Sequence, residues 1–168
     1  MKNHITIEEL RQMILYVAEQ VMKNETLLTE IDSVIGDGDH GKGMTTGFKE
    51  VWQELSCMKF QSTEDVLVAV GNVLIDTMGG ASGVLFGTMF ISGTVRRPAS
   101  LTMDLQDFAE IFRYSLNAIK KRGGAQIGDK TMVDALEPAV IALEKSVAER
   151  AGFCEGMKNA ATAAAVGV

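Results

Sequence analysis

The sequence predicts an all-α fold on three observations. Apolar residues recur at intervals of three and four positions along almost every regular segment, which is the period of a helix with one buried face. No segment shows a convincing alternation of apolar and polar residues, the pattern of a half-buried strand. The segments are joined by short loops, which suits helices packed side by side. We therefore expect a bundle or a ring of antiparallel helices.

Three helices are predicted in the first half of the chain. The first begins at a capping box, Thr6 to Glu9, and its apolar stripe continues to residue 21. A second stripe spans residues 44–55. The third helix opens with polar residues at 62–65 and is apolar nearly all round as far as residue 75, which predicts a buried position.

Four more segments follow in the second half. A fourth helix is expected over residues 82–90 and a fifth over 102–124, with a threonine as its first cap and two glycines at its end. A sixth spans residues 132–147, where Pro138 is expected to introduce a kink. From Phe153 onward the chain reads as the alanine-rich start of a last helix.

Length and composition predict one domain over residues 1–168. The chain is 46% hydrophobic and 23% charged, as in ordinary globular proteins. The net charge of −6 and the lack of clustered basic residues argue against a nucleic-acid partner. Two cysteines are too few for a disulfide framework, no apolar run reaches membrane-spanning length, and no signal peptide is evident. We expect a cytoplasmic protein without a membrane partner.

The segment from Asp32 to Gly41 carries three carboxylates and a histidine among glycines. The glycines allow tight turns, so Asp32, Asp37 and Asp39 can converge on one point. Three like charges at one point repel unless a cation lies between them, and oxygen ligands suit Mg²⁺. The alternative is a polar loop whose aspartates only cap turns and helix ends.

Two familiar motifs almost fit this segment and fail. A phosphate-binding P-loop needs Ser or Thr after the lysine, and the chain has Gly43 after Lys42. A calcium-binding EF-hand starting at Asp37 needs Glu at its twelfth position, which is Phe48. The segment is therefore neither of these motifs.

Two further loops are rich in glycine and precede predicted helices. The first is residues 77–83, where bare N–H groups at a helix start could bind an anion. The second is residues 123–131 and brings Lys130 and Thr131. One metal loop and two glycine-rich loops fit a nucleotide bound through Mg²⁺; a packed helix–helix turn is the alternative for residues 77–83.

Three ordered motifs carry a family resemblance. Residues 35–41 (IGDGDHG), 79–88 (GGASGVLFGT) and 128–135 (GDKTMVDA) resemble the nucleotide-binding L subunit of bacterial dihydroxyacetone kinases over nearly the whole chain. The resemblance implies an antiparallel eight-helix barrel with the nucleotide at one end, and an ADP/ATP-binding subunit of a phosphotransferase. It also implies two Mg²⁺ ions held by Asp32, Asp37 and Asp39.

The resemblance implies nucleotide contacts as well. They would come from the residues after the last aspartate, from the glycine loop and from the borders of the adenine site: His40, Gly41, Lys42, Gly43, Ala81, Ser82, Gly123 and Met132. No catalytic residue is expected from this subunit, because phosphoryl transfer needs mainly positioning and charge neutralisation.

The resemblance also implies partners. Dihydroxyacetone would be held on a separate K subunit. The position of His40, directly after the last aspartate, resembles the pattern of the phosphotransferase-dependent branch, in which bound ADP is recharged by a phosphorylated M subunit. In the alternative interpretation, His40 has no effect on which phosphoryl donor is used. A homodimer is a further alternative that the sequence neither favours nor excludes.

Two departures from the family pattern stand out. Many members have Asn where this chain has Gly43, and members continue beyond the alanine-rich segment, so we expect the barrel to be incomplete at the C-terminus. The alternatives to the dihydroxyacetone kinase subunit are a subunit acting on a related ketose such as erythrulose, a regulatory nucleotide-binding module, and a structural helical domain without metal.

Overall fold

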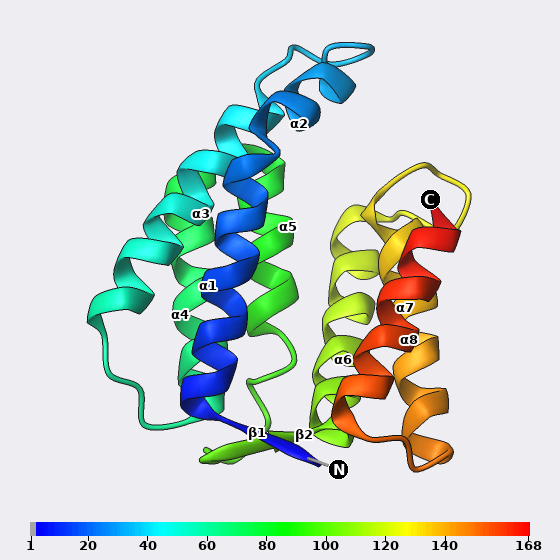
Figure 1. Ribbon diagram of the computed structural model, residues 1–168. Helices are drawn as coiled ribbons and strands as arrows, with labels where there is room; N and C mark the ends of the chain where they lie inside the picture. Colours follow the sequence, from blue (N-terminus) through cyan, green and yellow to red (C-terminus); the bar gives the residue numbers. More distant parts are fainter. Residues whose placement is uncertain (1–2) are drawn as a thin grey trace.

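The computed structural model describes residues 3–168 as eight helices and one small sheet (Figure 1). The elements in chain order are β1 (His4–Thr6), α1 (Ile7–Lys23), α2 (Glu25–Asp32), α3 (His40–Cys57), α4 (Thr63–Met78), α5 (Gly80–Ile91), β2 (Thr102–Asp104), α6 (Leu105–Gly123), α7 (Met132–Ala148) and α8 (Phe153–Gly167). The predicted all-α class is confirmed.

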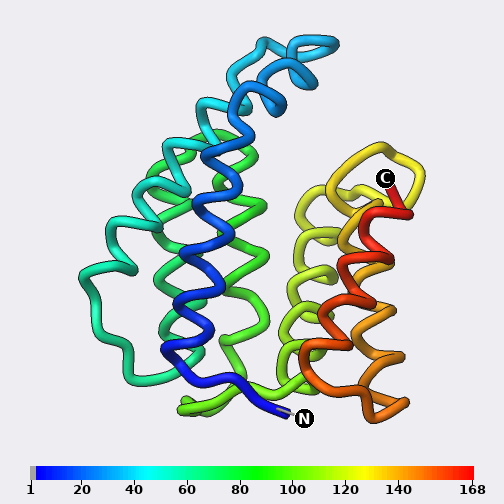
Figure 2. The backbone as a smooth tube through the Cα atoms, viewed as in Figure 1, coloured from blue at the N-terminus to red at the C-terminus, as the bar shows by residue number. Residues whose placement is uncertain are grey.

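The long helices pack mainly on their neighbours in the chain and run in alternating directions (Figures 1 and 2). α1, α3, α4 and α5 form one group, and α6, α7 and α8 form a second that joins the first through α5 and α6. α4 is the central helix of the first group: Val66, Val70 and Leu74 are fully buried, as its apolar sequence predicted. Closure of the helices into a barrel stays a prediction.

The sheet corrects the expectation of a chain without strands. β1 pairs with β2 in antiparallel register, Ile5 opposite Met103, and both of these side chains are buried. Each strand has three residues, which is too short to give a readable period of two. Figure 1 shows the sheet at the end of the helices opposite α2.

The predicted cap of the fifth helix was wrong. Thr102 lies in β2, and α6 begins three residues later, at Leu105. Asp104 is the cap: its carboxylate accepts the N–H of Asp107 at 2.8 Å, and the carboxylate of Asp107 accepts the N–H of Asp104 at 3.0 Å. The predicted capping box of Thr6 and Glu9 at α1 is confirmed, and Gly124 ends α6 in the left-handed region, with φ of 71°.

Two helical segments differ from the sequence prediction. α2 was not predicted; it has only eight residues, fewer than the sequence pattern of a helix needs to be recognised, and it buries no side chain completely. The alanine-rich end of the chain forms a helix of 15 residues that packs on α7, longer than the short start expected. None of the helices in residues 3–168 is both long and apolar enough to cross a membrane.

Candidate nucleotide and metal site

The three aspartates predicted to converge do so. Asp32 ends α2, while Asp37 and Asp39 lie in the loop that leads into α3. One carboxylate oxygen from each lies within 4.8 Å of the others, and this is the one group of potential metal ligands found in residues 3–168. Oxygen atoms at this separation can share a single hard cation such as Mg²⁺.

The loop geometry forces the carboxylates together. Gly38 has φ of 77°, a conformation that favours glycine. Gly36 packs directly on Asp32, where any side chain would overlap the carboxylate. The backbone N–H of His40 donates to Asp32 Oδ2 at 3.3 Å, which links the end of α2 to the start of α3.

Electrostatic repulsion accompanies this arrangement. The neighbouring carboxylate of Asp37 raises the pKa of Asp39 above its ordinary value, and the charge of Asp32 adds to the effect, while His40 opposes it. A divalent cation would remove the repulsion, so the chemistry of these donors fits a metal site better than a set of turn caps.

Two helices begin beside the aspartates, at one cavity. The starts of α3 and α5 line a cavity of about 480 Å³ together with the end of α4. Asp39 and Gly79, the residues that precede the two helices, make no side-chain cap. The N–H of His40 already donates to Asp32, so the N–H groups available to an anion are those that follow it in the first turn of α3 and those of the first turn of α5, and both helix dipoles favour an anion. His40 Nδ1 and Ser82 Oγ, 3.5 Å apart, bring the two helix starts together.

Most of the predicted nucleotide contacts line this cavity. His40, Lys42, Gly43, Ala81 and Ser82 do so, with Asp39 at the rim. The sequence analysis did not assign Met44 and Thr46 to the site, and it gave Thr77 and Met78 only as part of the glycine-rich loop 77–83. Helical spacing from Lys42 could have indicated Thr46. Thr77 and Met78 lie in the last turn of α4, and the packing of the helices brings this turn to the cavity.

Gly41 has a different position from its neighbours. It is buried beneath α2, where a side chain would overlap Thr29 Oγ1 and the carbonyl oxygen of Glu25. Its missing side chain allows α2 to lie against the first turn of α3. Gly41 therefore holds the aspartate loop in place and does not line the cavity.

Gly123 and Met132 lie at the same end of the molecule but do not line the cavity. A side chain at Gly123 would lie 4.0 Å from Leu85 Cδ2, and both Leu85 and Met132 pack on the smaller apolar cluster of α6 and α7. Leu85 is one turn after Ser82 on α5, so these residues lie beside the cavity on its α6 side. The loop between them is held by Asp134.

Asp134 fixes that loop through backbone hydrogen bonds. Its carboxylate accepts the N–H of Gly128 at 2.6 Å and the N–H of Thr131 at 2.9 Å. These two bonds lower the pKa of Asp134 below its ordinary value, and the bond from Gly128 has the larger effect. The loop is thus ordered by side chains of the chain itself.

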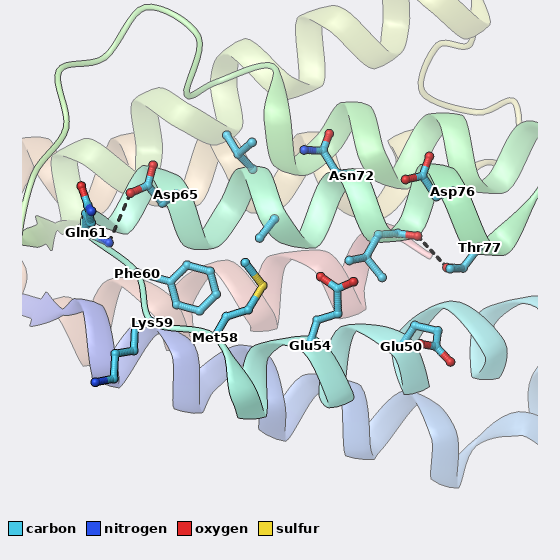
Figure 3. A pocket seen from close by; sticks show the side chains of 13 residues that line it. Glu50, Glu54, Met58, Lys59, Phe60, Gln61, Asp65, Asn72, Asp76 and Thr77 are labelled. Carbon is cyan, nitrogen blue, oxygen red and sulfur yellow. Dashed lines mark hydrogen bonds between the residues drawn. The ribbon is translucent and has the colours of Figure 1, made fainter.

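A second groove, of about 530 Å³, lies between α3 and α4 (Figure 3). Its charged lining is mostly acidic: Glu50, Glu54, Asp65 and Asp76 line it together with one lysine, Lys59. Four carboxylates with one lysine would repel the phosphates of a nucleotide. The smaller cavity at the aspartate loop is therefore the candidate nucleotide site.

Comparison with known proteins shows the family of the chain. A profile of the DAK2 domain matches residues 34–168. The chain belongs to the DAK2 domain family. The match begins within the aspartate loop, just after Asp32, and includes all three motifs and the residues that line the cavity.

Several curated relatives of this DAK2 chain are ADP-binding subunits of dihydroxyacetone kinases. The ADP-binding subunit DhaL of the PEP-dependent kinase 1 of Listeria innocua is 36% identical over 76% of this chain and 64% of its own length. The corresponding subunit of Escherichia coli is 38% identical over 71% of this chain and 57% of its own length. The chain thus spans about three fifths of the length of these relatives.

Solved structures confirm the fold. The native dihydroxyacetone kinase of C. freundii matches 95% of this chain with a TM-score of 0.77 and 26% identity, and the match covers 28% of that longer chain. The complex of the same kinase with AMP-PNP and Mg²⁺ has the same TM-score, 0.77, at 24% identity over 99% of this chain and 29% of its own. In that enzyme the domain is one part of a larger polypeptide.

Proposed function

We propose that this chain is the nucleotide-binding subunit of a dihydroxyacetone kinase. It would hold ADP or ATP with Mg²⁺ at the aspartate loop and pass the terminal phosphoryl group to dihydroxyacetone on a separate subunit. One observation carries the proposal: three carboxylates within 4.8 Å of one another stand beside the uncapped starts of two helices. The names of the DhaL relatives support ADP as the ligand.

Each group of the site has a physical role in this proposal. Asp32, Asp37 and Asp39 would hold two Mg²⁺ ions, which supply positive charge and orient the phosphates. N–H groups of the first turn of α3, after His40, and of the first turn of α5 would donate to phosphate oxygens, and glycines at both helix starts let the phosphates approach the backbone. His40 and Ser82 lie between the two helix starts and would fix the position of the phosphates. No side chain of the chain is required as a base.

Calorimetry on the purified chain tests the nucleotide site. ADP should bind in the presence of Mg²⁺ and bind far more weakly in EDTA. Asp39→Asn should weaken Mg²⁺-dependent binding by at least about tenfold, since even outer partners of metal ligands are worth 10–100-fold. Asp65→Asn, which removes a carboxylate from the groove of Figure 3, is the matched control and should bind as the wild type does. Equal affinity in wild type and Asp39→Asn would exclude the metal assignment.

The acceptor is proposed to sit on a partner, the K subunit. The surface next to the aspartates is open and apolar: Leu27, Ile31, Val34 and Ile35 are exposed, and Ile35 is 97% exposed. Apolar side chains beside a phosphoryl-transfer site suit a partner that covers it and excludes water. The substitution Ile35→Asp should then reduce turnover with the K subunit while ADP binding in calorimetry stays intact.

The phosphoryl donor is proposed to be a phosphorylated M subunit that recharges bound ADP. The support is the naming of the Listeria and Escherichia coli relatives as PEP-dependent kinases, together with His40 at the helix start. With K subunit and dihydroxyacetone present, ATP alone should give about one turnover per chain, and the phosphorylated M subunit should restore continuous turnover. Steady turnover with ATP alone would exclude this donor.

A related ketose is the second candidate acceptor. The L-erythrulose 1-kinase of Mycolicibacterium smegmatis is 37% identical over 77% of this chain, which spans 23% of that enzyme. Because the sugar would be bound by the partner, the present chain would serve either ketose. Turnover of dihydroxyacetone and erythrulose with the matching K subunit separates the two.

A further inference from the structure

The groove between α3 and α4 reaches the nucleotide cavity at one of its ends. Its α4 side extends from Asp65 to Asp76, a rise of about 16 Å along the helix. Thr77 lines both the groove and the nucleotide cavity, so the two hollows meet at the last turn of α4. A molecule bound in the groove would therefore lie beside the nucleotide cavity.

The lining of the groove has a clear excess of negative charge. Four carboxylates stand against one lysine, so the charged side chains of the lining sum to −3: Glu50, Glu54, Asp65, Asp76 and Lys59. None of these five side chains makes an ion pair with a residue in 3–168. Their charge is therefore not cancelled within the fold.

No other cation of the two helices compensates this charge. α4 contains neither lysine nor arginine, and the two lysines of α3 line other cavities, Lys42 the nucleotide cavity and Lys49 a hollow beside α1. The net charge of the whole chain, −6, has the same sign as the groove. The local and the overall charge thus both attract a cationic ligand.

The carboxylates of the groove are spread along it and do not form a metal centre. In residues 3–168 the aspartate loop holds the one group of three acidic side chains that converge within 4.8 Å. Figure 3 shows Glu50 and Glu54 on the α3 side of the groove and Asp65 and Asp76 on the α4 side. An elongated ligand that carries several cations can reach both sides, whereas one metal ion cannot.

Apolar side chains lie among the carboxylates. Met58, which is 45% exposed, and the half-buried Phe60 lie between the two helices in Figure 3. The half-buried Val68 and Ala69 line the α4 side. A polyamine would leave these side chains in water, whereas an amphipathic peptide segment would cover them with its own apolar face.

We propose that the groove between α3 and α4 binds a basic amphipathic helix of a partner protein. The length of the groove, about 16 Å, matches about three turns of helix. Lysine or arginine side chains of the partner pair with Glu54 on one side and Asp76 on the other, and apolar side chains between them pack on Met58 and Phe60. This binding does not depend on the proposed nucleotide function.

Other occupants fit this charge less well. Nucleic acid and acidic segments are repelled by the lining and by the chain as a whole. A second copy of the chain offers residues 120–122 as its longest run of basic residues, but Lys120 is already paired with Glu137 at 2.8 Å. Charge complementarity therefore favours a separate basic partner.

A synthetic peptide tests the proposal on the full chain. The probe is a fluorescein-labelled helical peptide of about twelve residues, with lysines along both edges of a face of leucine and phenylalanine. In fluorescence anisotropy the wild type should bind it in EDTA without nucleotide. The double variant Glu54→Gln, Asp76→Asn should bind it about fivefold or more weakly, since each exposed ion pair contributes modestly.

Two controls separate the groove from the overall charge. The double variant Glu30→Gln, Glu155→Gln removes two exposed carboxylates of α2 and α8 that make no ion pair with residues in 3–168, so it changes the net charge equally and should bind as the wild type does. A second peptide, with the same lysines but serine in place of leucine and phenylalanine, should bind the wild type about tenfold or more weakly.

The outcomes are distinct. NMR shifts on peptide addition should cluster in residues 50–61 and 65–77. Equal binding by the wild type and the groove variant, equal binding of the two peptides, or shifts that map elsewhere would overturn the proposal. Self-association of the wild type that the groove variant abolishes in sedimentation would also overturn it, because a second copy would then be the occupant. Since the assay contains neither metal nor nucleotide, failure of the nucleotide site would leave these results unchanged.

Discussion

Gly47 sets the distance between the aspartate loop and the glycine loop. It lies on α3, where a Cβ would overlap Met78 Cγ and would come within 3.1 Å of Leu74 Cδ2, both on α4. Met78 is the last residue of α4 and directly precedes the glycine loop. The substitution Gly47→Ala should therefore push α3 away from α4 at the nucleotide site.

The expected magnitude follows from two opposing terms. Adding a methyl group to a well-packed contact lowers the free energy of unfolding by about 1–3 kcal/mol. Replacing glycine by alanine inside a helix raises it by about 0.5–1 kcal/mol. The net loss is about 1–2 kcal/mol, or roughly 2–8 °C in the melting temperature of a domain of this size. ADP binding with Mg²⁺ should weaken as well, because the starts of α3 and α5 move apart.

Gly43, one turn earlier on α3, is the matched control for stability. A Cβ there would lie 3.8 Å from the carbonyl oxygen of Met78, an ordinary contact. Gly43→Ala should therefore raise the melting temperature slightly, through helix propensity alone. Calorimetric melting of both variants checks the pair. A Gly47→Ala variant as stable as Gly43→Ala would refute the close contact that we infer between α3 and α4.

Three other predictions concern charge. Asp39→Asn should raise the melting temperature of the metal-free protein at neutral pH. The pKa of Asp39 is raised in the folded protein, so ionisation of this carboxyl destabilises the fold once the pH exceeds the ordinary pKa of an aspartate. An unchanged melting curve would contradict the repulsion between the aspartates. Arg97→Met leaves the carboxylate of Glu64, 10% exposed, without its counter-ion and should cost about 2–4 kcal/mol, whereas Arg122→Met should change chemical denaturation by less than about 0.5 kcal/mol. The pKa of Asp134 is lowered in the folded protein, so its ionised carboxylate stabilises the fold fully above pH 3.8, and this stabilisation is lost as the pH falls through the folded-state pKa. Amide exchange in the loop before α7 should therefore accelerate only in acid, and Asp134→Asn should remove that pH dependence.

The helices were readable from the sequence wherever one face is buried. α1 and α6 combine capping boxes with clear apolar stripes, and the third predicted helix proved to be the buried α4. Prediction failed where burial is slight or elements are short: α2 buries no side chain, and the strands have three residues each. Thr102 was chosen as a cap because the strand that contains it could not be recognised.

The candidate site divides along similar lines. The aspartates could be predicted because their convergence depends on glycines within ten residues of the same segment. Gly41 could not be placed, because its burial depends on how α2 folds back over α3. Met78 and Thr77 reach the cavity only through the packing of α4 between α3 and α5, which local sequence does not encode.

The site combines two opposite preferences for charge. The uncapped starts of α3 and α5 favour an anion, while Asp32, Asp37 and Asp39 repel one and favour a cation. The carboxylates repel a nucleotide that binds without a cation, and the positive ends of the two helices repel a cation that binds without a nucleotide. A magnesium–nucleotide complex satisfies both sets of groups at once, since the cation contacts the carboxylates while the phosphates contact the helix starts. We therefore expect the affinities for metal and nucleotide to rise together, each ligand strengthening the binding of the other by the same factor.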